Sequence, residues 1–393
     1  MTTIRAGGSP ATVLRTVLDH GPIARSTIAR LTGLSPATVT TTSNRLIDRG
    51  LLRERPTVVA VGSRRMGRPH VPIDIADEPM VCGIHLSLTH ITVSLVDLRG
   101  RVIATDRHAH RGQPPNTVLD VAVELMTELT ADRASRVLGI GFAVGGWVDP
   151  DRGIVVEHPL TCWNGVAVRE LLEHRTGFDV HVDSHVRALV DAECLFGEPR
   201  ARRSVVQLFV GNVIDAAFAT DGLVHAGPGS AAGAVAHMPI EHSTEHCSCG
   251  RTGCFQATLS ERVLVRDAVR RGIIEVPDFG VLLAAAESGN PSATQLLVDR
   301  SYRVGLVSGS LLDILNPEVF IVCDPGMHVL PECLDAVRAG VAESSYGRRD
   351  VVDSVLPSSF HGRLLPVAGG ASMLGKLYRD PLEQLTGQLA PAL

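Results

Sequence analysis

Residues 237–254 read HMPIEHSTEHCSCGRTGC, in which His237, Cys247, Cys249 and Cys254 follow the pattern H-x9-C-x-C-x4-C. Three thiolates and one imidazole are the ligand set of a closed, tetrahedral zinc site. Glycines between the cysteines allow the tight backbone turns that bring the sulfur atoms together. Because four protein ligands leave no position for an activated water, the motif predicts a structural Zn2+ ion and not a catalytic one.

Alternatives remain open for this stretch. His242 and His246 lie in the same segment, so the histidine ligand is less constrained than the three cysteines. Without a metal, the pattern would amount to three small buried residues and a surface histidine. A regulator that senses zinc is a further alternative, although three thiolates usually hold an ion that is part of the folded structure.

The composition is that of an ordinary soluble protein, with 393 residues of which 45% are hydrophobic and 20% charged. This length predicts two or three domains. The first ten residues lack the apolar segment of a secretory signal, and the longest apolar run, 137–148, is too short to span a bilayer. Eight cysteines, three of them in the zinc motif, fit a reducing compartment. We therefore expect a cytoplasmic protein without a membrane partner.

Charge is distributed unevenly along the chain. Residues 1–75 contain eleven arginines and four acidic residues, a net charge of +7, whereas the remainder carries −12. Such asymmetry predicts a small basic module that binds a polyanion, attached to a larger acidic body.

The basic segment has the pattern of a helix-turn-helix. Apolar residues recur at helical spacing between 13 and 18, and a Gly-Pro pair ends this first helix. A short second helix is expected from Ser26 to Leu31, with Ser26 as its N-cap and Leu31 facing inward. After a glycine turn, Ser35 is expected to cap a third helix that has proline at its first position.

The third helix has the features of a DNA recognition helix. Its outer face is small and polar, which permits close approach to base edges in the major groove. The stretch 51–75 predicts a two-stranded wing whose arginine-rich loop suits phosphate contacts or a narrow minor groove. A dimerisation module or a plain three-helix bundle are the alternatives. The residues predicted to contact double-stranded DNA are Ser35, Ala37, Thr38, Thr41, Asn44, Arg45, Arg64, Arg65 and Arg68.

From residue 77 onward the chain predicts an α/β body. Strands are expected at 80–98, 137–144 and 179–183, and again at 205–210, 216–220 and 319–323, with helices between them. Two successive sets of strands followed by helices indicate two similar lobes. The cleft between such lobes is the default position for a ligand.

These features together resemble the ROK family (repressors, open reading frames, kinases) over essentially the whole chain. The resemblance implies a two-lobed, actin-like (ribonuclease-H-like) sugar-kinase fold preceded by an α+β winged helix-turn-helix, with a sugar-binding cleft and assembly into dimers or tetramers. The matching stretches are Leu95-Val-Asp97-Leu-Arg-Gly100, Gly141-Phe-Ala-Val-Gly145-Gly146, Trp163-Asn164, Asp183, Phe196-Gly197, Gly233 to His237, Cys247 to Cys254 and Asn316-Pro-Glu-Val319.

Three departures from the family's kinases predict that the chain is not an enzyme. The first phosphate loop, acidic and glycine-rich in the kinases, reads GIHLSLT at 83–89, with His85 in place of the acid. The second, normally Gly-Thr-Gly, reads GNVID at 211–215, and the Asp215 carboxylate would repel ATP. The glycine pair near the adenosine position is replaced by CDPG at 323–326. Backbone amides therefore cannot wrap a phosphate in the family's way.

The sugar site implied by the resemblance is also altered. Asp183 stands at the position of the kinases' catalytic base, but an aspartate at a strand end is often a helix N-cap. His237 would bind zinc through one ring nitrogen and a sugar hydroxyl through the other. The loss of other polar residues predicts weak binding of an ordinary monosaccharide, so an altered ligand, a protein partner or no effector stay open. The implied effector-binding residues are Gly145, Asn164, Asp183, His237 and Gln256.

The sequence therefore predicts a zinc-containing, ROK-type transcriptional regulator of carbohydrate-related genes. A sugar, a sugar phosphate or an altered ligand would tune it, and a homodimer or homotetramer would bind a palindromic operator. The alternative is a sugar kinase with a fused DNA-binding module. We expect a DNA-binding domain at 1–76 and an effector-binding and oligomerisation domain at 77–393, with lobes at about 77–195 and 196–375 and a C-terminal helix at about 369–390.

Overall fold

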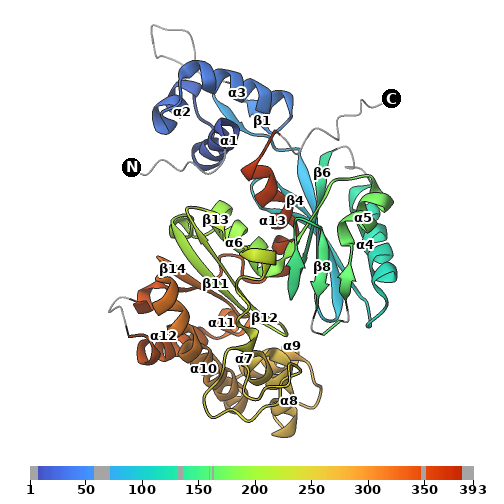
Figure 1. The fold of residues 1–393 in the computed structure, drawn as a ribbon, viewed down its shortest axis with the longest axis vertical. Helices are drawn as coiled ribbons and strands as arrows, with labels where there is room; N and C mark the ends of the chain where they lie inside the picture. The colour runs from blue at the N-terminus through green and yellow to red at the C-terminus, as the bar shows by residue number, and fades with distance from the viewer. Residues whose placement is uncertain are drawn as a thin grey trace.

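The computed structural model describes residues 8–56, 71–131, 136–158, 160–161, 163–346 and 351–382. Figure 1 shows a small N-terminal unit above a larger body made of two lobes. Each lobe contains a five-stranded sheet, and a helix near the C-terminus lies between the N-terminal unit and the first lobe. The mixed α/β architecture expected from the sequence is thus confirmed.

The N-terminal unit is a winged helix-turn-helix. Helix α1 (Ser9–His20), α2 (Arg25–Thr32) and α3 (Pro36–Asp48) are followed by an antiparallel pair, β1 (Leu52–Glu54) and β2 (Ile73–Ile75). The core between the helices contains residues that expose no side-chain surface, among them Val13, Leu14, Val17, Ile28, Val39 and Leu46. These residues recur at helical spacing, so burial of one face of each helix fixes the unit.

Two details of α2 differ from the prediction. The helix begins at Arg25 after Ala24, so Ser26 lies within its first turn and does not cap it. Leu31 is 46% exposed and does not face inward, because Ile28 alone supplies the fully buried contact of this short helix. The helix ends at Gly33, whose φ of 71° is the left-handed conformation that glycine adopts without strain.

The first lobe contains a mixed sheet in the order β10-β6-β3-β4-β5. Its strands are β3 (Met80–Leu86), β4 (His90–Asp97), β5 (Val102–Ala109), β6 (Val137–Val144) and β10 (Val180–Ser184). Helices α4 (Pro115–Thr130) and α5 (Val168–Thr176) cover one face, and a small sheet of β7 (Trp147–Asp149), β8 (Ile154–Glu157) and β9 (Asn164–Val166) lies beside it. β3 and β10 are buried along their whole length, as expected for strands covered on both faces.

The second lobe contains a sheet in the order β13-β12-β11-β14-β15. Its strands are β11 (Ser204–Val210), β12 (Ile214–Thr220), β13 (Leu223–Val224), β14 (Val319–Cys323) and β15 (Val355–Pro357). Helix α6 (His185–Phe196) packs on β11 and β12. The remaining helices are α7 (Phe255–Leu259), α8 (Glu261–Arg270), α9 (Phe279–Glu287), α10 (Pro291–Leu315), α11 (Gly326–Val329) and α12 (Pro331–Ser344), with 3-10 turns η2 (Pro199–Arg202), η3 (Pro228–Ser230), η4 (Val235–His237) and η5 (Val351–Ser354).

Helix α13 (Leu364–Arg379) returns to the first lobe and packs on β3, β6 and α6. It begins and ends earlier than the helix expected at about 369–390, because the chain turns at Asp380-Pro381. A Cβ atom on Gly83 would overlap the backbone nitrogen of Gly370, and one on Gly141 would overlap the carbonyl oxygen of Gly369. Glycine is therefore required on both sides of this contact, since the helix touches the sheet backbone directly.

The N-terminal unit rests on the body through α1. Val17 belongs to the same buried cluster as Leu195 of α6 and Leu374 and Leu377 of α13. At the rim, Arg202 donates to both carboxylate oxygens of Asp19, at 2.8 and 2.7 Å. Helix α3 lies on the far side of the unit in Figure 1, so its outer face stays open.

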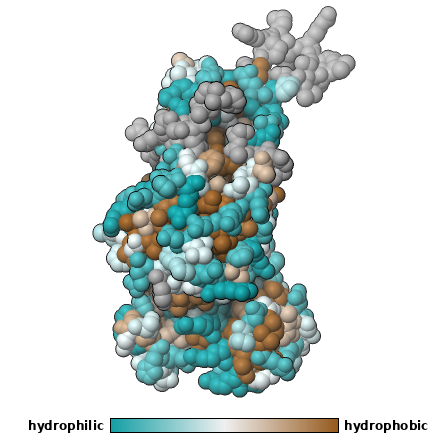
Figure 2. All heavy atoms as spheres, turned by 90° about the vertical axis from the view of Figure 1, so that its right-hand side faces the viewer, coloured by the Kyte–Doolittle hydropathy of each residue, from teal (hydrophilic) through white to brown (hydrophobic). Residues whose placement is uncertain are grey.

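Hydrophilic side chains predominate on the face drawn in Figure 2, and hydrophobic ones form patches between them. Within the described part of the chain, no helix combines the length and apolar character needed to cross a bilayer.

Candidate functional site

Helix α3 presents the predicted DNA-facing surface. Ser35 caps the helix: its Oγ accepts from the backbone N–H of Thr38 at 3.1 Å and lies 2.8 Å from the Thr38 hydroxyl. These two side chains are therefore occupied in the cap. Ala37, Thr41, Asn44 and Arg45 are exposed along one face of the helix, and Thr40, which the prediction omitted, is exposed with them. Arg64, Arg65 and Arg68 of the predicted wing lie outside the described residues.

An arginine that sequence reasoning missed positions Asn44. The Arg25 guanidinium donates to the Asn44 side-chain oxygen at 3.1 Å and to a carboxylate oxygen of Glu54 at 2.9 Å. It thereby joins α2, α3 and β1 at the surface that would face DNA. Because its oxygen accepts from Arg25, the group that Asn44 can offer to a base edge is its amide N–H2 donor. Nineteen residues separate the pair, so no local pattern marks it.

The four predicted zinc ligands come together. One ligand atom from each of His237, Cys247, Cys249 and Cys254 lies within 4.8 Å of all the others. Nδ1 of His237 is 3.5 Å from the Cys247 sulfur, and the Cys249 and Cys254 sulfurs are 3.6 Å apart. His242 and His246 are not part of the cluster. The donor set and its convergence fit a tetrahedral Zn2+ ion.

The backbone favours thiolate at one of these cysteines. The Arg251 backbone N–H, together with its guanidinium, lowers the pKa of Cys249 to about 6. Burial instead raises the pKa of Cys254 to about 12 in the absence of a metal. Gly250 and Gly253 have φ of 85° and 75°, so the chain can reverse between the ligands as predicted.

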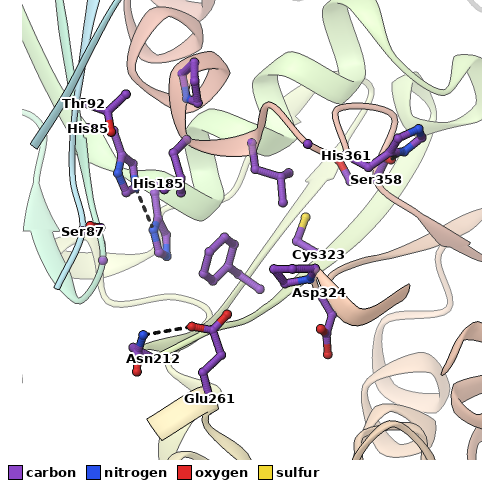
Figure 3. A pocket seen from close by; sticks show the side chains of 18 of the residues that line it. His85, Ser87, Thr92, His185, Asn212, Glu261, Cys323, Asp324, Ser358 and His361 are labelled. Carbon is purple, nitrogen blue, oxygen red and sulfur yellow. Dashed lines mark hydrogen bonds between the residues drawn. The ribbon is translucent and has the colours of Figure 1, made fainter. Parts of the chain in front are cut away.

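A cavity of about 740 Å3 lies between the two lobes. All three segments that the family resemblance assigns to nucleotide line it: residues 85–88, residues 211–213 and residues 323–325. Of the five predicted effector residues, only Gly145 lines this cavity. Figure 3 shows His85 and His185 on one side of the cavity and Ser358 and His361 on the other.

The other predicted effector residues have different surroundings. Asn164 is exposed on β9, where it pairs with Glu157. The Gln256 side-chain oxygen accepts from the Ile214 backbone N–H at 3.3 Å. His237 contributes its Nδ1 to the cysteine cluster described above.

Asp183 forms a buried ion pair with Arg187. Its carboxylate accepts from Nε of Arg187 at 2.6 Å, and the two side chains are 9% and 5% exposed. The same guanidinium donates to the carbonyl oxygens of Ser230 and Val148, both at 3.0 Å. Arg187 thus joins β7 of the first lobe to η3 of the second. Its hydrogen bonds to Asp183, Ser230 and Val148 hold these segments together.

Comparison with known proteins assigns the chain to a family. A model of the ROK family matches residues 81–375, which cover most of the chain. The chain belongs to the ROK family. A MarR family model matches residues 11–58 of the winged helix-turn-helix.

Named relatives of this ROK protein are regulators. A transcriptional regulator of Mycobacterium tuberculosis is 32% identical over 392 residues, covering 95% of this chain and 87% of the relative. The xylose repressor of Caldicellulosiruptor bescii is 27% identical over 327 residues, covering 79% and 81% of the two chains. The DNA-binding transcriptional dual regulator NagC of Escherichia coli is 24% identical, with 79% of each chain covered.

Solved structures confirm the ROK fold. A ROK family transcriptional regulator, described as a homolog of the E. coli MLC protein, superimposes with a TM-score of 0.79 at 22% identity, over 97% of this chain and 98% of that one. A ROK glucokinase from Streptomyces griseus, in complex with glucose and AMPPNP, superimposes with a TM-score of 0.67 at 21% identity. The match covers 74% of this chain and 98% of the glucokinase. The two-lobed fold preceded by a winged helix is therefore shared with family members.

Proposed function

We propose that this ROK protein is a DNA-binding transcriptional regulator without kinase activity. Residues 1–76 would bind double-stranded DNA and residues 77–393 would bind the effector and oligomerise. The observation that carries the proposal is the open, polar face of α3, where Ala37, Thr41, Asn44 and Arg45 are exposed at the end of the molecule farthest from the lobes. A capped helix with small side chains on its outer face suits insertion into the major groove.

The contacts of Asp183 support the absence of kinase activity. A catalytic base must reach the proton that it removes, within hydrogen-bond distance of the substrate. Arg187 neutralises this carboxylate and fills the space beside it with its own bonds to Val148 and Ser230. At the second phosphate loop, the Asp215 carboxylate accepts from the backbone N–H of Gly146 at 3.1 Å, where a nucleotide phosphate would meet a negative charge.

His237, Cys247, Cys249 and Cys254 would hold one structural Zn2+ ion. The ion would fix the loop between η4 and α7. Assembly as a two-fold dimer, or a tetramer built from such dimers, predicts a palindromic operator with half-sites one helical turn or a multiple apart. The regulated genes would concern carbohydrates, as the names of the xylose repressors suggest.

Two measurements on the full chain test the proposal. A selected-oligonucleotide binding profile should recover a palindromic motif, and a random or featureless profile would contradict it. A coupled assay with MgATP and a panel of monosaccharides should show no turnover above background. Turnover at rates ordinary for kinases, about 1–100 per second, would favour a sugar kinase with a fused DNA module.

A further inference from the structure

The interlobe cavity has lost the character of a nucleotide site. Among the described residues that line it, Arg107 is the only lysine or arginine, and it is exposed on β5. Arg300 lies close by, but its guanidinium is used by Asp324 at 3.0 Å and by the carbonyl oxygens of Leu259 and Val210. Among the described lining residues, the exposed Arg107 is therefore the one lysine or arginine available to a triphosphate, which ordinarily needs several cations.

Most of the cavity wall is apolar. The lining residues without polar side chains come from both lobes and from the start of α13: Leu86, Leu88, Phe209, Val213, Leu283, Val322, Pro325, Met327, Val329, Pro357, Leu364, Leu365 and Pro366. The volume of about 740 Å3 lies in the range of small-molecule sites, roughly 300–1,000 Å3. A cavity of this size and lining favours a ligand with a hydrocarbon or aromatic body.

One end of the cavity carries hydrogen-bonding groups. Nε2 of His85 is 3.4 Å from Nδ1 of His185, and the two rings stack with centroids 5.7 Å apart. The other nitrogen of each ring, Nδ1 of His85 and Nε2 of His185, is buried without a hydrogen-bond partner. Nε2 of His185 lies 3.6 Å from the Asp215 carboxylate. Both side chains line the cavity, although these two nitrogens have almost no accessible surface. An unsatisfied buried nitrogen is costly, so a ligand that bonds to one of them after a turn of the ring gains affinity.

These groups do not favour an anion. Burial, and to a smaller extent the neighbouring His185 and His158, hold the pKa of His85 well below its usual value. Burial also lowers the pKa of His158 to about 4, so both imidazoles are neutral near pH 7. Asp215 adds a negative charge at the same end. A hydroxyl or carbonyl oxygen can bond to neutral imidazoles here, whereas a carboxylate or phosphate would be repelled by Asp215.

We propose that the interlobe cavity, at the place where the family's kinases bind nucleotide, binds an uncharged and largely apolar small molecule that presents a hydroxyl or carbonyl group to one ring of the His85–His185 pair. This inference rests on the proposed regulatory function, for which such a molecule would be the effector. Leu364, Leu365 and Pro366 give the ligand direct contact with the start of α13, and the other end of α13 contacts the DNA-binding unit.

Nile red, an uncharged aromatic dye with a carbonyl group, is the probe that tests the proposal. Full-length protein should bind about one dye per chain with a blue-shifted emission. Leu365→Trp fills the cavity from α13 and should weaken binding at least about tenfold. Ile314→Trp is the matched control, because Ile314 is 76% exposed and does not line the cavity. Equal binding by wild type and Leu365→Trp would overturn the proposal.

The polar end is tested with a second pair of probes. His85→Phe should reduce Nile red affinity by about fivefold to tenfold, the effect of one lost hydrogen bond, and leave binding of pyrene, which has no polar atom, unchanged. Equal losses for both dyes would overturn the assignment of the head group. A further experiment uses the wild-type protein alone. Displacement of Nile red by submillimolar MgATP would show a retained nucleotide site and overturn the proposal.

These experiments distinguish failure of the ligand assignment from failure of the proposed regulatory function. If the dye fails to bind while the protein still selects a palindromic oligonucleotide, the ligand assignment is wrong and the regulatory function stands. If the dye binds as expected but no DNA motif is selected, the cavity stands and the regulatory function is wrong.

Discussion

At the scale of single residues, the convergence of the four proposed metal ligands is the feature that the sequence predicted best. Short spacings force Cys247, Cys249 and Cys254 into one loop, so their convergence depends only on local turns. The choice among three histidines was not local, because His237 comes from η4 while His242 and His246 lie nearer in sequence. In the structure the His237 ring lies with the three sulfur atoms, and neither His242 nor His246 belongs to the cluster.

We predict that His237→Ala loses the bound zinc and His246→Ala keeps it. The His237 imidazole belongs to the four-atom cluster, whereas the exposed His246 does not. Metal analysis of purified protein should give about one zinc per chain for wild type and His246→Ala. A metal content in His237→Ala equal to that of wild type would show that another group completes the site. The midpoint temperature of thermal unfolding should also fall by several degrees in His237→Ala, because structural zinc contributes to folding.

A second residue-scale prediction concerns Glu261. Burial raises the pKa of this carboxyl group to about 7, so the folded chain binds a proton that the unfolded chain releases near its ordinary value of 4.5. Its contribution is thus fully favourable below pH 4.5 and is lost as the pH rises through 7. Glu261→Gln should remove about 2 kcal/mol of the fall in unfolding free energy between pH 5 and pH 8. Urea unfolding at both pH values measures this, with exposed Glu287→Gln as control; an unchanged pH dependence in Glu261→Gln would contradict the prediction.

At the scale of elements, the sequence predicted what local patterns encode. The apolar spacing in α1 and α3, the Ser35 cap and the positions of the strands along the chain all follow from neighbours in the sequence. Contacts between distant segments were not predictable in this way. No local pattern explains Gly83 and Gly141, and only the return of α13 shows that helix backbone occupies the space of their absent side chains.

The ion pair between Asp183 and Arg187 was predictable only in part. Arg187 follows it by four residues across a strand end and a helix start, a spacing that could have suggested the pair. Its depth and its bonds to the other lobe could not be read from the sequence, because Val148 and Ser230 are about forty residues away in opposite directions.

For the recognition helix, we predict that Asn44→Ala relaxes base preference. The Asn44 amide is the longest uncharged donor on the exposed face, and a lost base contact costs about 1–3 kcal/mol of discrimination at one position. Arg25→Met should cause part of the same loss, because it frees the Asn44 oxygen that Arg25 holds. Oligonucleotide binding profiles measure both. Ser26→Ala, at an exposed position of α2, serves as control, and an unchanged profile for Asn44→Ala would show that another face of α3 reads the bases.

At the scale of the whole molecule, α13 connects the cavity with the DNA-binding unit. Its first residues line the cavity, its glycines touch β3, and Leu374 and Leu377 share a buried cluster with Val17 of α1. A ligand can act on DNA binding through α13 only by binding two positions of this helix with different affinity, which shifts their populations. Such coupling is reciprocal, so DNA must change ligand affinity by the same factor.

The Arg202–Asp19 pair provides a test of this coupling. Arg202 donates to both oxygens of Asp19 and fastens α1 to the body, but it does not contribute to the α3 surface. Arg202→Ala should therefore leave DNA affinity without ligand within about twofold of wild type. The ratio of operator affinities with and without saturating Nile red, expected to be at least about fivefold in wild type, should fall towards one. Arg200→Ala is the matched control, since within the described part of the chain the Arg200 side chain bonds only to Glu198, two residues before it. A ratio that survives in Arg202→Ala, or is lost equally in Arg200→Ala, would mean that the signal does not pass through the contact between α1 and the body.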